Sequence, residues 1–395
     1  MNNTNLNKVP RIDVADALRG LAIMAILLIH CVEHFIYPVY PDTLAQPAWL
    51  NAIDSITFNT TFSLIAGKGY SIFALLFGFT FYVQYTNQQN KGADFRWRFV
   101  WRLILLAFFA TINAAFFPGG DVLMLFVFTG ISLVLVCRMS NKTILIIAVV
   151  CLMQPIELLH FVYSCFDKSH TLPQLNVGAL YKEVQAGVQS GNWNNFFLKN
   201  ITTGQKASLM WAVGCGRFVQ TIGLFLTGFL LSRNNYFVKS DQNNRFWVKL
   251  LIISAIAFAI LYPLKVQWYD NSATPIIKDT IGTVLDMWQK LSLTIVIVSS
   301  FILAYYNTNF EKWTAKLRIY GKMSLTNYVA QSIIGALLFF PVGLNLAPYL
   351  GYTASLILGI FIFIVQLHIC NIWYKKHKQG PLEKLWHSAT WIGNK

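Results

Sequence analysis

Long apolar stretches recur along the whole chain and are separated by short segments rich in polar and charged residues. Most of them approach the ~20 apolar residues that an α-helix needs to cross a bilayer. The pattern predicts an all-α integral membrane protein with about ten transmembrane helices. The predicted helices cover residues 16–37, 60–85, 99–117, 121–137, 143–166, 208–231, 248–264, 281–306, 324–341 and 351–373.

The positions of the basic residues orient these helices. Lys and Arg gather in alternate loops, as at 91–102 and 312–322, whereas the loop 38–59 contains none. Because cytoplasmic loops of membrane proteins carry an excess of Lys and Arg, both termini are expected in the cytosol. The chain is expected to be a multi-pass protein of the bacterial cytoplasmic (inner) membrane, with the lipid bilayer as its first partner.

The chain is predicted to form a single membrane domain over residues 1–395, because no polar segment is long enough for a separate soluble domain. The first helices occupy residues 1–166, and the remaining helices occupy residues 208–395. Between them lies the one long loop, 167–207, which contains the amphipathic sequence LYKEVQAGVQ and the aromatic sequence NWNNFF. Such a segment suits a helix or lid that lies on the outer leaflet.

Composition supports the membrane assignment and excludes other classes. The chain is 55% hydrophobic and only 12% charged, whereas soluble domains carry about a quarter charged residues. The net charge of +15 is explained by the basic residues of the predicted cytosolic loops, so no nucleic-acid partner is expected. Six cysteines lie in or beside apolar stretches without CxxC spacing, which indicates neither a zinc site nor a disulfide framework.

The first apolar stretch carries the clearest functional signal, because His30, Glu33 and His34 follow it while the pattern is still helical. Spacings of three and four residues place these side chains on one helix face. Ionisable groups at membrane depth usually face a protein interior or a wet cavity. We predict that His30 is a catalytic base and that Glu33 orients its ring. The alternative is a polar cluster that only locks helices together.

Other predicted helices bring titratable groups to a similar depth. Glu157 and His160 form a second pair, three residues apart. Asp121 lies at the outer mouth of the fourth helix, and Arg217 lies near the middle of the sixth. Because an Arg within the membrane needs an anion, Arg217 either pairs with Glu33, Glu157 or Asp121 or holds the substrate. We expect the residues named in this paragraph, together with His34, to contact the substrate. The predicted cavity lies between the first, fourth, fifth and sixth helices.

A metal site is an alternative use of the two His–Glu pairs. His30-x-x-Glu33 and Glu157-x-x-His160 have the ligand spacing of carboxylate-bridged metal bundles. A full site needs further carboxylates, and no metal is expected.

Two lysines in predicted helices also bear on the structure. Lys68, between Gly67 and Gly69, indicates either a break in the second helix or a side chain that reaches toward the outer surface. Its place about three turns from the outer end favours the second interpretation. Lys290 follows Asp286 by four residues, a spacing that favours an ion pair.

A third group of charges lies at the cytosolic end of the first helix, where Asp16 and Arg19 stand three residues apart and Arg11 precedes them. One interpretation is a site for a phosphorylated donor, because a guanidinium matches phosphate geometry. The other is an acid at a helix start together with topological positive charge, which requires no ligand. Spacing alone leaves both open.

These residues resemble known families. Asp16-x-x-Arg19-Gly20, followed by His30, resembles the first helix of the acyltransferase-3 group, in which a His on this helix is taken as the catalytic base and the Arg is needed. The rest of the chain is similar to the YeiB-type family of the same broad superfamily. The matching stretches are LFGF (76–79), GDVL (120–123), GKMSLTNYVAQS (321–332) and GPLEKLW (380–386).

The chain departs from the YeiB-type pattern at a few positions. Those proteins often have Asn at the place of His30 and His at the place of Asn113. They also have Trp and Arg more often than Lys384 and His387. The His is thus shifted from the third helix to the first, which bears on which residue serves as the base.

The resemblance implies a membrane acyltransferase that moves an acyl group, most simply acetyl, from cytosolic acyl-CoA to an acceptor across the membrane. The acceptor would be a hydroxyl or amine of an envelope glycan, a lipid or a small molecule. Arg11, Asp16 and Arg19 would bind the donor. Transport through the same charged groups, a non-catalytic role and a homodimer stay open as alternatives.

Overall fold

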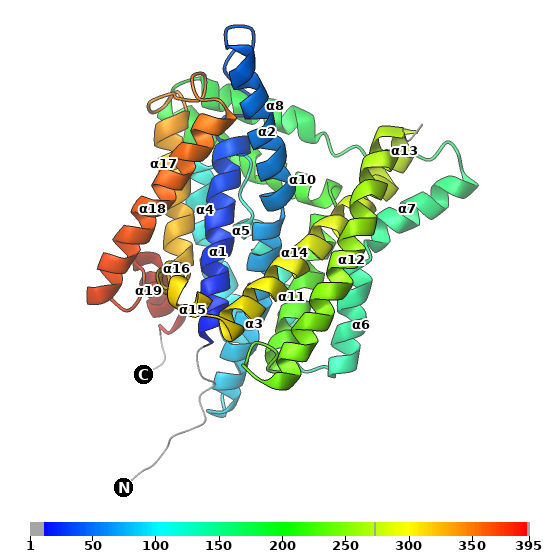
Figure 1. Cartoon of the computed structure of the whole chain (residues 1–395), viewed down its shortest axis with the longest axis vertical. Helices are drawn as coiled ribbons and strands as arrows, with labels where there is room; N and C mark the ends of the chain where they lie inside the picture. Colours follow the sequence, from blue (N-terminus) through cyan, green and yellow to red (C-terminus); the bar gives the residue numbers. More distant parts are fainter. Residues whose placement is uncertain (1–11, 272–273, 393–395) are drawn as a thin grey trace.

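The computed structural model describes residues 12–271 and 274–392, and Arg11 therefore lies outside the described residues. This part of the chain is all helical and contains no strand, which confirms the predicted fold class. In Figure 1, α1 runs through the middle of the bundle, with α17 and α18 on one side and α12 and α14 on the other.

The helices before the long loop are α1 (Asp13–Ile29), the π-helical turn η1 (His30–His34), α2 (Ala48–Ile65), α3 (Lys68–Gln89), α4 (Arg96–Phe116), α5 (Leu123–Val136), α6 (Asn141–Leu152) and α7 (Pro155–Phe166). The loop and the start of the sixth predicted helix hold α8 (Val177–Gln189), α9 (Trp193–Lys199), η2 (Asn200–Gly204) and α10 (Gln205–Gly214). The rest are α11 (Arg217–Arg233), α12 (Asp241–Asn271), α13 (Pro275–Ile277), η3 (Lys278–Gly282), α14 (Thr283–Asn307), α15 (Phe310–Trp313), α16 (Ala315–Lys322), α17 (Ser324–Phe339), α18 (Tyr352–Lys376) and α19 (Pro381–Thr390).

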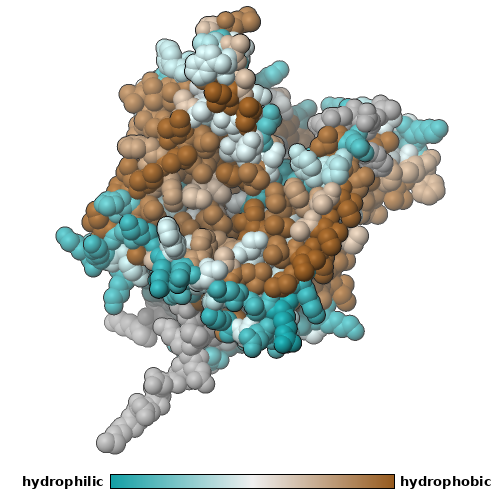
Figure 2. Space-filling view, viewed as in Figure 1, coloured by the Kyte–Doolittle hydropathy of each residue, from teal (hydrophilic) through white to brown (hydrophobic). Residues whose placement is uncertain are grey.

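Six helical segments of the described residues are long and apolar enough to cross a membrane, and two bent helix pairs raise the number to eight. The shorter apolar helices α5 and α17 occupy two further predicted segments. Figure 2 shows a broad hydrophobic surface that ends at the bottom in a hydrophilic rim. The count of about ten spans and the cytosolic placement of both termini stay predictions.

The close approach of α3 and α11 depends on glycine. A Cβ atom on Gly78 would overlap the carbonyl oxygen of Phe225, and a Cβ atom on Gly228 would overlap that of Leu75. Two backbones can approach this closely only where neither helix carries a side chain, as is usual at helix contacts in membranes. This contact places the N-terminal ends of α3 and α11 beside each other.

Two motifs that carry the family resemblance hold each other through hydrogen bonds. Glu383 in GPLEKLW accepts hydrogen bonds from the backbone N–H groups of Leu325 (2.6 Å) and Thr326 (3.1 Å), and from the Thr326 hydroxyl (2.6 Å). The carboxylate thus satisfies free donors at the first turn of α17. Farther along this helix, the Ser332 hydroxyl donates to Asn113 Oδ1 (2.8 Å), and Asn113 donates to Asp121 of GDVL (2.9 Å).

The structure around Lys68 corrects the prediction that its side chain reaches toward the outer surface. The helix breaks at Ala66 and Gly67, where Gly67 adopts φ = 79°, and α3 begins at Lys68. The lysine does not reach toward the surface: it is only 3% exposed, and its Nζ donates to the carbonyl oxygen of Ser63 at 2.6 Å. The break frees backbone carbonyls at the end of α2, and the ammonium satisfies one of them. The predicted pair of Lys290 and Asp286 is confirmed at 2.5 Å.

Candidate functional site

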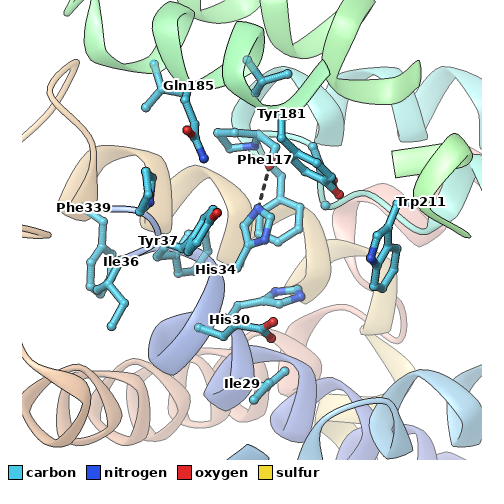
Figure 3. A pocket seen from close by; sticks show the side chains of 18 of the residues that line it. Ile29, His30, His34, Ile36, Tyr37, Phe117, Tyr181, Gln185, Trp211 and Phe339 are labelled. Atoms are coloured by element: carbon cyan, nitrogen blue, oxygen red, sulfur yellow. Dashed lines mark hydrogen bonds between the residues drawn. The ribbon is translucent and has the colours of Figure 1, made fainter. Parts of the chain in front are cut away.

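A cavity of about 640 Å³ lies at the C-terminal end of α1, on the predicted outer side. Its wall combines η1, the breaks before α3 and α11, the turn at 117–122, and parts of α14 and α17. The long loop forms its roof through α8 (Figure 3). We call it the outer cavity. The predicted fifth helix, which the structure divides into α6 and α7, was expected to line this cavity but does not. Helices α3, α14 and α17 line it instead.

The π-helical turn η1 presents His30, Glu33 and His34 to the outer cavity, so the structure brings these predicted residues together. Turns of this kind occur frequently at functional sites. His34 Nε2 lies 2.7 Å from the carbonyl oxygen of Pro118, and its ring stacks on Phe117 with centroids 4.1 Å apart. The ring of His30 lies 4.4 Å from the same Phe117. Phe117 therefore holds both imidazoles in place.

His30 and Glu33 remain available to a ligand. Among the described residues, neither the His30 ring nor the Glu33 carboxylate has a hydrogen-bond partner, and both line the cavity. Glu33 is exposed there and does not bond to His30. The arrangement can accept a proton from a bound hydroxyl or amine at His30, with Glu33 as a nearby negative charge.

Arg217 enters the outer cavity from the first residue of α11. Its guanidinium carbon lies 5.0 Å from the ring centre of Tyr70 and 4.5 Å from that of Trp211. Cation–π contacts of this kind hold a cation in place without neutralising it. Lys290 from α14 reaches the same cavity.

The roof helix α8 is fastened to the turn below it. The Tyr181 hydroxyl donates to the carbonyl oxygen of Gly119 at 2.9 Å, and Figure 3 shows Tyr181 and Gln185 extending from α8 above His34. Burial raises the pKa of Tyr181 to about 12, so the phenol stays protonated and can donate. At the other side of α8, Glu183 pairs with Lys199 at 2.5 Å.

The Tyr181→Phe substitution should loosen the roof without unfolding the protein. One hydrogen bond contributes ~1 kcal/mol, so local opening of α8 should become about five times more frequent. Hydrogen–deuterium exchange of the α8 amides measures this opening. Tyr349→Phe, at a ring that is 76% exposed, is the control. Unchanged exchange in Tyr181→Phe would show that the roof is held by its apolar contacts alone.

Other predicted substrate residues lie outside the outer cavity. Asp121 is buried and accepts from Asn113 and from the backbone N–H groups of Leu123 (3.2 Å) and Met124 (3.3 Å), so it caps the start of α5. His160 lies within 2.9 Å of His170.

Glu157 also lies apart from the outer cavity. It borders the break between α6 and α7, where Gln154 is fully buried and Gly216 of the α10–α11 break packs against both side chains. The two His–Glu pairs are thus not brought together. Within the described ranges, no three His, Cys, Asp or Glu side chains gather in a metal-binding arrangement.

A second cavity of about 290 Å³ opens at the other end of the bundle, and we call it the inner cavity. Arg19 lines it and bonds to Asp16 (2.7 Å) and to the Thr80 hydroxyl (2.9 Å). Sequence reasoning did not identify its other basic residues, because they come from helices far apart in the chain. These are Arg102, Lys322, Lys378 and His387.

Only a thin layer separates the two cavities. On α3, Tyr70 lines the outer cavity and Phe73 lines the inner one. On α17, Tyr328 lines the outer cavity and Leu325 lines the inner one. Residues three apart lie within one helical turn, ~5 Å along the axis. At α3 and α17 the layer is therefore about one turn thick and consists of aromatic and aliphatic side chains, whereas along α1 about two turns separate Arg19 from the outer cavity.

Comparison with known proteins identifies one family that matches part of the chain and several relatives of similar length. Residues 231–393 match a family described as a protein of unknown function, DUF418. The chain is 26% identical to the uncharacterized protein YxaH of Bacillus subtilis (strain 168), over 97% of this chain and 94% of the relative. It is 22% identical to an uncharacterized 39.9 kDa protein in the amylase 3′ region of Bacillus acidopullulyticus, over 96% and 94%.

A further relative is the uncharacterized protein YeiB of Escherichia coli (strain K12), which is 26% identical over 95% of each chain. No solved structure matches the chain. The matched C-terminal region contains α12 to α19 and includes both halves of the contact between Thr326 and Glu383. The C-terminal part of the chain thus matches the DUF418 family, and nearly the whole chain is similar to YeiB.

Proposed function

We propose that this protein is a membrane acyltransferase that uses an acyl-CoA from the cytosolic side and modifies a hydroxyl or amine in the outer cavity. One observation carries the proposal: a His–Glu–His turn opens into a ligand-sized cavity that lies one helical turn from a basic cavity at the opposite end. An acyl group attached to a long flexible donor would have to cross only that layer.

The inner cavity suits the phosphates of CoA by its chemistry. Arg102 is held over the Trp386 ring at 4.3 Å, and its buried Nε has no partner among the described residues. Arg19, Lys322 and Lys378 supply further positive charge around the same space. Guanidinium groups match phosphate oxygens in a two-pronged geometry. The pantetheine arm would extend from here toward His30, which lies ~16 Å from Arg19 along α1.

The donor supplies an activated thioester carbonyl, and the chain supplies the proton transfer. His30 removes the proton from the acceptor's hydroxyl or amine as that oxygen or nitrogen attacks the carbonyl carbon. The carbon–sulfur bond then breaks, and the imidazolium returns the proton to the leaving thiolate. Glu33 stabilises the transient imidazolium, because it places a negative charge in the same cavity.

Acetyl-CoA binding to detergent-purified protein, measured by calorimetry, tests the donor site. Lys378→Gln removes an exposed cation that lines the inner cavity, and it should weaken binding by about two- to fivefold, as expected for one exposed ion pair. Arg19→Gln should weaken it by about 10- to 100-fold, because a charge-assisted bond is lost. Lys376→Gln changes an exposed lysine outside the cavity and is the control. If the wild type bound neither acetyl-CoA nor longer acyl-CoAs, the donor site would be excluded.

A transporter is the competing function, and the broken helices favour it. The α6–α7 pair bends by 55° and the α10–α11 pair by 77°, and discontinuous helices commonly surround transport sites. This function predicts uptake or efflux that depends on a proton gradient, with no acyl-CoA binding. The calorimetric experiment therefore separates the two functions.

A further inference from the structure

We propose that the outer cavity contains an oxyanion site between Arg217 and Lys290, and that the acceptor carries a phosphate or carboxylate group that binds there. Both side chains line the cavity that also contains His30 and Glu33. The identification of the occupant as the acceptor rests on the proposed function. The anion site itself rests on the arrangement of charges described next.

Arg217 has no anionic partner in the described part of the chain. Its guanidinium is held between Tyr70 and Trp211 by ring contacts alone, with no ion pair or hydrogen bond to a carboxylate. A guanidinium presents five N–H donors in a fixed fork that matches carboxylate or phosphate oxygens. An Arg within a membrane protein is costly unless an anion satisfies it. The two rings fix the direction of the fork before any ligand arrives.

Neighbouring charges do not neutralise the site. Asp286 is shared between Lys290, at 2.5 Å, and Lys265. Lys68 is satisfied by the carbonyl oxygen of Ser63, which carries no charge. Among the described residues, Glu33 is the acid that lines the cavity; it forms no ion pair with Arg217 or Lys290, although its charge acts on both across the cavity. At the cavity and directly behind it, four interacting basic groups thus outnumber two carboxylates, and a bound anion would reduce the excess positive charge.

The helix starts add positive potential at the same place. Gly67 (φ 79°) and Gly216 (φ 71°) precede α3 and α11, and neither helix has a side-chain cap. A Cβ atom on Gly67 would lie 3.2 Å from Lys290 Cδ and 3.5 Å from Arg217 Nη2. Acids are favoured at a helix N-terminus, whereas these two helices each begin with a basic residue. A bound anion removes that unfavourable arrangement at both helices.

The size of the cavity indicates what else the ligand contains. A space of about 640 Å³ is within the range of pockets for small organic ligands and exceeds the volume of a single phosphate or carboxylate group. The remaining space extends to His30, so an anionic group at Arg217 would leave a hydroxyl or amine of the same molecule near the imidazole. An anionic envelope lipid, glycan or metabolite fits this description.

Thermal unfolding of the purified full chain in phosphatidylcholine nanodiscs, without acyl-CoA, tests the site. Inorganic phosphate and acetate are titrated against chloride at matched ionic strength. Phosphate or acetate should raise the melting temperature in a saturable way that chloride does not reproduce. Arg217→Gln should weaken the apparent affinity by about 10- to 100-fold, and Arg217→Lys should restore part of it. Lys206→Gln, an exposed lysine of α10 outside the cavity, should behave as wild type.

Glu33→Gln provides a second variant that does not depend on the folding of Arg217→Gln. Removal of the negative charge from the cavity should keep or increase the affinity for phosphate. Nanodiscs that contain phosphatidylglycerol distinguish the source of the anion: competition with phosphate identifies a lipid headgroup, and its absence identifies a soluble or glycan-borne oxyanion. No saturable effect on the wild type, or equal affinity in Arg217→Gln, would overturn the proposal. Acetyl-CoA binding can fail or succeed independently of this result.

Discussion

Replacement of His30 by glutamine is expected to slow acyl transfer by about 10²- to 10⁴-fold, the usual contribution of a positioned general base. The side chain lies in a cavity and contacts Phe117, so the variant should fold and should still bind acetyl-CoA. Transfer of a radiolabelled acetyl group to membrane components, in inside-out vesicles supplied with labelled acetyl-CoA, measures the effect.

His160→Gln is the matched control, because this histidine contacts His170 and lies outside the outer cavity. It should transfer label at the wild-type rate. Equal transfer by His30→Gln and wild type would remove His30 from the chemistry. Absence of transfer in all three proteins, despite acetyl-CoA binding, would instead identify a non-catalytic member of the family.

The second large effect concerns folding. Gly228→Ala is expected to destabilise the protein by ~3 kcal/mol or more, because the new methyl group would overlap the carbonyl oxygen of Leu75 and force α3 and α11 apart. Helix propensity acts in the opposite direction, since Ala is favoured over Gly inside a helix by ~1 kcal/mol. A loss of stability would therefore report the interhelical contact and not the helix itself.

The melting temperature and the yield of monodisperse protein on size-exclusion chromatography measure this effect. Gly178→Ala is the control, because no atom lies within 4 Å of a Cβ placed there. If Gly228→Ala melted at the wild-type temperature, the backbones of α3 and α11 could not be as close as described.

Sequence pattern predicted most of the helical segments and the cluster on the first helix, because apolar length and the spacing of His30, Glu33 and His34 are local properties. It placed residues 48–59 in a loop, whereas the structure includes them in α2. It did not predict where helices break. Gly216 adopts a left-handed conformation, but the letters CGR look like part of a continuous apolar helix. The break turns Arg217 from a residue at mid-helix into the first residue of α11, which decides where its charge lies.

Depth along a helix also proved insufficient to group residues in space. Glu157 and His30 were expected at one level and in one cavity, yet Glu157 faces the break beside Gln154. The rotation of each helix about its own axis decides which cavity a side chain enters, and a single sequence does not fix it. The inner cavity was only partly predicted, because Lys378 and Arg19 are far apart in the sequence and only the tertiary structure brings them to the same cavity.

The family motifs acquire physical roles in this structure. GPLEKLW supplies the carboxylate that caps α17, and GDVL supplies the acid that caps α5. LFGF supplies Gly78 for the contact with α11. These motifs therefore build the walls of the two cavities. His30, Glu33 and Arg217 line the outer cavity but are not part of the motifs.

The thin layer between the cavities has an electrical consequence. Where water reaches into a membrane protein from both sides, the membrane potential falls mainly across the dry part that remains, here about one helical turn. A charged group that crossed between Phe73 and Tyr70 would thus experience nearly the full potential, about 2.3 kcal/mol per elementary charge at 100 mV. A neutral acyl group would cross the same distance without this cost, whatever the voltage of the cell.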